Sequence, residues 1–127
     1  MLHVTGFFAG ILAFLYIGLS FNVIRGRYAH KLILGDGGHD HMVRRIRVHA
    51  NFAEYIPFAL ILMGIDEING SSHFALEFWG IVLVIGRVFH AYSLLVSEIK
   101  RTGYPYFRSI GMVSTFGAII ALAIMAL

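Results

Sequence analysis

Residues 44–57, which read RRIRVHANFAEYIP, hold most of the polar chemistry of this sequence and run directly into the apolar segment FALILMGI. On a helix with 100° per residue, five polar side chains of this stretch fall within an arc of about 100°. The side chains of Arg45 and His49 point elsewhere. We call the five the polar stripe, and they are Arg44, Arg47, Asn51, Glu54 and Tyr55.

The polar stripe combines two guanidinium groups, an amide, a carboxylate and a phenol. A guanidinium presents a planar fork that matches a carboxylate, and a carboxylate can accept hydrogen bonds from an ammonium group. The pattern therefore fits a small zwitterionic ligand. It also fits an internal salt-bridge ladder, in which Arg47 pairs with Glu54 and steadies a helix packed against its neighbours.

The composition is that of a membrane protein. Of the 127 residues, 58% are hydrophobic and only 13% are charged, whereas a soluble domain carries about 25% charged residues. The length predicts one domain, over residues 1–127. Because the sequence has no cysteine, it excludes disulfides, thiolate metal sites and cysteine nucleophiles, and any thiol chemistry must come from a ligand.

Two segments, residues 7–24 and 110–127, are each 18 residues long without a charge, which is enough to cross the hydrocarbon core of a bilayer. Two further apolar segments lie between them. The prediction is an all-α membrane protein, an up-down bundle of four transmembrane helices with short connections. The predicted helices cover about 4–25, 42–65, 74–97 and 108–127.

Lysine and arginine are distributed unevenly between the connections. Nine of the ten lie in or beside the first and third connections, and the exception is Arg87. The second connection carries Asp66 and Glu67 instead. The positive-inside rule predicts a multi-pass protein with loops 26–42 and 98–107 in the cytoplasm and both termini on the opposite side.

The third segment carries Arg87 and His90 on one face. A buried guanidinium without a partner is costly, so Arg87 needs a carboxylate, carbonyl groups or a ligand. We predict Glu54 as its structural partner, and the alternative is direct contact with a ligand. Four helices cannot bury this much polarity alone, which favours a symmetric oligomer with the polar stripes at subunit interfaces.

The first connection contains the cluster His39-Asp40-His41. Histidine and aspartate are common metal ligands, but residues this close together lack the usual ligand spacing. The sequence therefore predicts a solvated loop here and no metal site.

At residues 44–57 the pattern RxxRxxxNxxEYxP resembles the second-helix signature of the MAPEG family, the membrane-associated proteins of eicosanoid and glutathione metabolism. The motif GRVFH over residues 86–90 is similar to a third-helix element of the family. The pair Arg108-Ser109 is similar to an arginine-serine pair at the start of the fourth helix. The loop GDGG and the elements IRVHAN and EYIP look most like the branch of small bacterial YecN-like inner-membrane proteins.

The resemblance implies a homotrimer that binds glutathione between neighbouring subunits near the cytoplasmic face. It implies a microsomal-type glutathione S-transferase, or a peroxidase, that acts on lipophilic electrophiles arriving through the bilayer. By position, the resemblance assigns glutathione binding to Arg47, Asn51, Glu54 and Tyr55, with help from Arg44, Arg87 and His90. It assigns Arg25 and Arg27 to the carboxylate of the peptide. It gives Arg108 and Ser109 the catalytic role of stabilising the glutathione thiolate.

The sequence departs from the mammalian members at Leu94, where those enzymes commonly carry a tyrosine, and its third connection is longer. The missing tyrosine at Leu94 favours an alternative function, a non-catalytic MAPEG-like membrane protein that binds a lipid or an anionic metabolite. A small multidrug transporter is a third reading of the length and helix count. Such a transporter needs an acidic residue in its first helix for proton coupling, and residues 7–24 contain none.

Overall fold

The computed structural model describes residues 1–97 and 105–127, and those residues form helices and no strand. Four of the helices are long and apolar enough to cross a membrane. The predicted all-α fold with four spanning helices is confirmed. In chain order the elements are α1 (His3–Ala29), α2 (Asp40–Ile68), α3 (His73–Tyr92), a short π-helix η1 (Ser93–Ser97) that continues α3, and α5 (Tyr106–Ala126).

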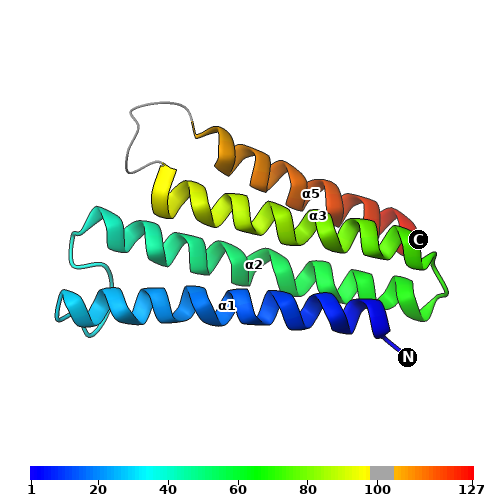
Figure 1. The fold of residues 1–127 in the computed structure, drawn as a ribbon, viewed down its shortest axis with the longest axis horizontal. Coiled ribbons are helices and arrows are strands. Elements are labelled where there is room, and N and C mark those ends of the chain that lie inside the picture. The colour runs from blue at the N-terminus through cyan, green and yellow to red at the C-terminus, as the bar shows by residue number, and fades with distance from the viewer. Residues whose placement is uncertain (98–104) are drawn as a thin grey trace.

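The four long helices run side by side in alternating directions, as Figure 1 shows. Both termini lie at one end of the bundle, beside the turn between α2 and α3. The connection between α1 and α2 lies at the other end with η1 and the start of α5, and we call this the basic end. Helix α1 packs on α2 and α3 on α5, while α2 also contacts α3 and α5.

The helices extend further into the connections than the sequence predicts. Helix α1 continues to Ala29 and α2 already begins at Asp40, so the first connection shrinks to residues 30–39. Arg27 lies in the last turn of α1, where a cation interacts favourably with the helix dipole and its aliphatic stem can cover apolar surface. Residues 98–104 of the predicted third loop lie outside the described residues.

A carboxylate from α2 caps the start of α1. Helix α1 has no side-chain cap of its own, and Glu67 near the end of α2 takes this role. Its two oxygens accept hydrogen bonds from the backbone N–H groups of Val4 at 2.8 Å and Thr5 at 2.7 Å. An anion satisfies the unpaired donors of a helix N-terminus and complements its dipole, so this contact fastens α1 to α2 at the end that carries the termini.

Two glycines allow α3 and α5 to approach closely near the basic end. A Cβ atom on Gly111 of α5 would lie 2.6 Å from the carbonyl oxygen of Gly86 and 2.9 Å from the backbone nitrogen of His90. Any larger residue would push the two backbones apart, since backbone atoms cannot rotate away. The contact sets the last two turns of α3 directly against the first two turns of α5.

Candidate functional site

The centre of the site is Arg87, which is 2% exposed. Its Nη1 donates a hydrogen bond to Oδ1 of Asn51 on α2 at 2.8 Å, and its Nη2 lies 3.8 Å from Sδ of Met112 on α5. The Nε atom is buried and has no hydrogen-bond partner among the described residues. A guanidinium in a membrane-spanning segment is thus held by one amide and one weak sulfur acceptor, which leaves capacity for a further acceptor.

Further polar side chains gather around Arg87. Tyr55 of α2 lies near Arg87, and the Tyr55 ring packs edge-on against Phe116 of α5 with 5.3 Å between ring centroids. His90 lies one turn beyond Arg87, is 4% exposed, and is within electrostatic reach of Arg87, Arg47 and Arg108. Three helices therefore bring together what we call the polar cluster, which consists of Arg47, Asn51, Tyr55, Arg87, His90 and Arg108.

The polar stripe of α2 divides between the interior and the surface. Asn51 is buried and Tyr55 half-buried, whereas Arg47 and Glu54 are exposed. The predicted pairing of Arg87 with Glu54 is wrong, because Asn51 takes this place. Glu54 is three residues further along and lies about 60° around the helix from Asn51. Within the described part of the chain, no ion pair joins Arg47 to Glu54, so this pair of the alternative salt-bridge ladder is not formed.

Two residues between the stripe positions hold α2 against α1. Nη1 of Arg45 donates a hydrogen bond to the backbone carbonyl of Asn22 at 3.0 Å. Nε2 of His49 and Oγ of Ser20 share a hydrogen bond at 3.0 Å, and the His49 ring stacks on Tyr16 at 4.8 Å between centroids. The prediction that Arg45 and His49 point away from the polar stripe is confirmed, and their contacts fix the rotation of α2.

The remaining predicted residues lie outside the polar cluster of one chain. Arg44 lines a separate cavity of about 240 Å³ with Arg45 and leucines of α1 and η1. Arg25 is exposed on the last turns of α1, and Arg27 lines an outer cavity with Tyr28 and Lys31. Ser109 is half-buried beside Arg108 in the first turn of α5.

The sequence analysis missed the wall that α5 contributes. Met112 contacts the Arg87 guanidinium and Phe116 packs on the Tyr55 ring. Both follow Arg108 at four-residue intervals, so the three side chains line one face of α5. This spacing is the signal that could have found them, although their apolar character gave no reason to assign them to a site.

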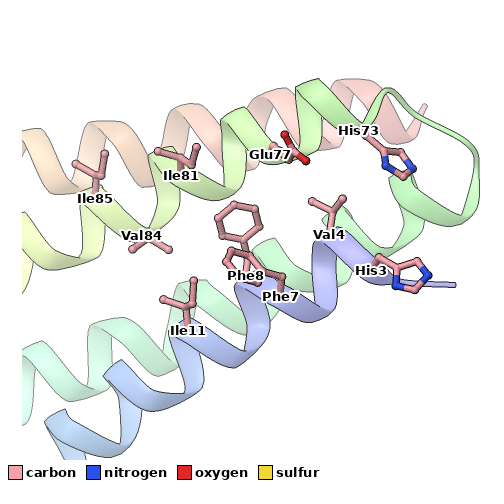
Figure 2. Close-up of a pocket in the computed structure, with 10 residues that line it drawn as sticks. All are labelled: His3, Val4, Phe7, Phe8, Ile11, His73, Glu77, Ile81, Val84 and Ile85. Atoms are coloured by element: carbon pink, nitrogen blue, oxygen red, sulfur yellow. The ribbon is translucent and has the colours of Figure 1, made fainter.

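An apolar cavity of about 570 Å³ lies between α1 and α3 at the opposite end of the bundle. Figure 2 shows His3, His73 and Glu77 at its end nearest the N-terminus and apolar side chains deeper along it. Its inner end at Val84 and Ile85 comes within three residues of Arg87 along α3, but the cavity is lined by α1 and α3 and by no residue of the polar cluster, so we describe it apart from this site. The apolar side chains that line it are Val4, Phe7, Phe8, Ile11, Ile81, Val84 and Ile85.

Comparison with known proteins agrees with the family resemblance of the sequence motifs. The model of the MAPEG family matches residues 5–127. Two relatives, both called inner membrane protein YecN, come from Escherichia coli strain K12 and Escherichia coli O6:H1. Each is 39% identical over 90 residues, which are 71% of this chain and 69% of the relative. The match extends through all four spanning helices, and this chain belongs to the MAPEG family.

Proposed function

We propose that the protein is a membrane-bound glutathione-dependent transferase for lipophilic electrophiles, with the polar cluster as part of its glutathione site. The observation that carries the proposal is the partly satisfied guanidinium of Arg87, buried beside Asn51. Family membership supports a role in glutathione or eicosanoid metabolism. The name of the YecN relatives supports the bacterial inner membrane as the location, and we place the basic end in the cytoplasm.

The donor set fits the groups of glutathione, which carries two carboxylates, one ammonium group and a thiol. Arg47 and Arg87 would hold carboxylates, and Asn51 and Tyr55 would donate or accept hydrogen bonds to the peptide. Glu54 would take the ammonium group. Each of these residues therefore has a matching partner in the ligand.

The exposed part of the polar stripe supports a site between subunits. Arg47 and Glu54 are exposed on a helix that spans the membrane, and charged side chains facing lipid are costly. A neighbouring subunit in a homotrimer would cover them and complete the site. Three arginines lie outside the polar cluster of their own chain. In such an assembly they would be available to a site shared between two subunits, and they are Arg25, Arg27 and Arg44.

Bound glutathione would supply the sulfur nucleophile, whose attack on an electrophilic carbon forms a C–S bond and displaces a leaving group with its electron pair. A free thiol has a pKa near 8.5 and is mostly protonated at neutral pH. The Arg108 guanidinium would favour the thiolate by its positive charge, and the Ser109 hydroxyl would donate a hydrogen bond to it. The apolar side chains around the cluster would exclude water from the reacting groups.

The test is a conjugation assay on the detergent-purified protein with glutathione and a lipophilic aryl halide. We expect S-aryl glutathione and halide to form in equal amounts, faster than without protein, and the rate to survive in the matched control Lys31→Ala. A wild-type rate equal to the uncatalysed rate with every electrophile would contradict transferase activity. Oxidation of glutathione by a lipid hydroperoxide would instead assign the protein as a peroxidase.

One observation favours a second candidate, a non-catalytic protein that binds a lipid or an anionic metabolite. Leu94 is 7% exposed and packs in the core, at the position where the mammalian enzymes it resembles carry a tyrosine. That position therefore supplies no hydroxyl to a bound thiolate. Tight binding of an anionic ligand together with the absence of any conjugation would favour this function.

A further inference from the structure

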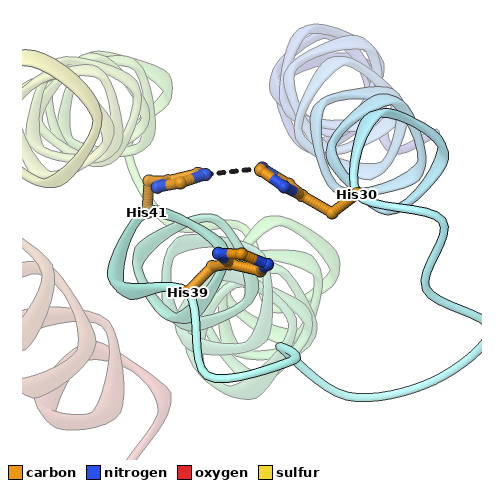
Figure 3. A group of neighbouring side chains, drawn as sticks. All are labelled: His30, His39 and His41. Carbon is orange, nitrogen blue, oxygen red and sulfur yellow. Dashed lines mark hydrogen bonds between the residues drawn. The ribbon is translucent and has the colours of Figure 1, made fainter.

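Three histidines converge at the basic end, where α1 ends and α2 begins. His30 directly follows α1, His39 directly precedes α2, and His41 lies in the first turn of α2. One ring nitrogen from each lies within 4.8 Å of the others. Figure 3 shows the His30 and His41 rings pointing toward one another with His39 beside them. The sequence pattern singled out only the cluster His39-Asp40-His41 and predicted no metal site there, because His30 lies nine residues away on the other side of a loop.

The backbone holds all three positions in place. The His30 N–H donates to the carbonyl of Gly26 at 3.1 Å, and the chain then reverses at Lys31, which has a positive φ of 54°. The His39 N–H donates to the Asp36 carbonyl at 3.1 Å, and the His39 carbonyl accepts from Met42 at 2.9 Å. The convergence is thus a property of the two helix ends and the turn that joins them, and only side-chain rotation is needed to adjust it.

The rings already interact closely. Nε2 of His41 and Nε2 of His30 lie 2.6 Å apart, and the His30 and His39 rings stack at 4.1 Å between centroids. Two ring nitrogens at this distance must share either a proton or a cation, since two lone pairs repel each other. His30 and His39 are partly exposed and His41 is exposed, so a metal ion in solution can reach the cluster.

We infer that His30, His39 and His41 form a binding site for a divalent transition metal ion, for which Zn²⁺ is the best match. Imidazole nitrogens bind Zn²⁺ at about 2.0–2.1 Å in a tetrahedral arrangement, which separates two such nitrogens by about 3.3 Å. The Nε2 atoms of His30 and His41 are closer than this at 2.6 Å, and the ligand atoms all lie within 4.8 Å of one another. Side-chain rotations that change these separations by up to about 1.5 Å would complete the site. Three protein ligands leave the fourth position to water.

Such an ion would link the end of α1 to the start of α2 through its bonds to the three imidazole rings. The cluster lies next to the Arg44 cavity, because His41 lines that cavity too. The inference does not rest on the proposed transferase function, since it uses no residue of the polar cluster.

The experiment is a calorimetric titration of the detergent-purified protein with ZnCl₂, in the absence of thiols and with a purification tag that contains no histidine. We expect one ion per chain in the wild type and a loss of affinity of at least about 100-fold in His30→Ala and in His39→Ala, because changing even a residue behind a metal ligand costs about 10–100-fold. Cobalt(II) should give the intense visible bands of a four-coordinate ion in the wild type only.

His73→Ala is the matched control, since His73 is an exposed histidine at the opposite end of the bundle. Zinc binding should be unchanged in this variant. Circular dichroism and gel filtration of each variant establish that the bundle is intact, which is expected because the substituted side chains lie outside the core. No binding to the wild type, equal binding to all variants, or a loss that follows His73 would each overturn the inference.

Discussion

Replacing Arg108 with alanine should leave glutathione bound and remove its thiolate. If the guanidinium lowers the thiol pKa by about 2 units, it stabilises the thiolate relative to the thiol by about 2.7 kcal/mol. About three quarters of the bound glutathione is then ionised at pH 7. Without the guanidinium the pKa returns toward 8.5 and the ionised fraction falls to about 3%. The ultraviolet absorbance of the thiolate, recorded as a difference spectrum during titration with glutathione, measures this change directly.

Two comparisons make this measurement specific. Arg108→Lys keeps a positive charge and should retain part of the thiolate absorbance, although an ammonium group lacks the planar fork of a guanidinium. Titration of each variant with S-methyl glutathione, which cannot ionise, reports binding alone. Unchanged thiolate absorbance in Arg108→Ala at neutral pH would remove Arg108 from the proposed mechanism.

The second large effect is expected at the buried pair of Arg87 and Asn51. In Arg87→Met/Asn51→Leu, apolar side chains of similar size replace a guanidinium and an amide that satisfy one another only in part. When packed apolar residues replace a buried charged network, the free energy of unfolding often stays the same or rises by about 1–4 kcal/mol. We therefore expect a melting temperature at or above that of the wild type, measured by circular dichroism in detergent.

The same double variant should lose most of its affinity for glutathione. A hydrogen bond to a charged group contributes about 1.5–3 kcal/mol, so removal of the guanidinium should weaken binding by at least about 10-fold. Lys31→Met is the matched control, because Lys31 is an exposed cation in the first connection and lies outside the polar cluster. A steep fall in melting temperature in the double variant would show instead that Arg87 is a structural residue.

The sequence predicts the helices better than their rotation. Uncharged runs such as 7–24 identify the spans, because bilayer thickness fixes the length of an apolar helix. The partner of Arg87 depends on how α2 turns about its axis, and a rotation of about 60° separates Asn51 from Glu54. That rotation is set by contacts with α1 such as the one between Arg45 and Asn22, and no local pattern encodes it.

Other features depend on packing between distant segments. His30 joins His39 only because the first connection folds back on itself, so a spacing rule applied to consecutive residues does not detect it. The π-helical turn η1 beyond α3 was also not predicted, since such turns are rare. The resemblance to the MAPEG family predicted that all six residues of the polar cluster belong to one site, whereas helix periodicity groups only residues of the same helix.

The most direct test is a calorimetric titration of the detergent-purified wild-type protein with glutathione, beside Arg47→Ala/Glu54→Ala. Both substituted side chains are exposed in the single chain, so each protomer should fold normally, and gel filtration checks that the assembly is unchanged. We predict saturable binding to the wild type and its loss in the variant. Absence of binding to the wild type would contradict the central proposal and would mean that the polar cluster serves another ligand.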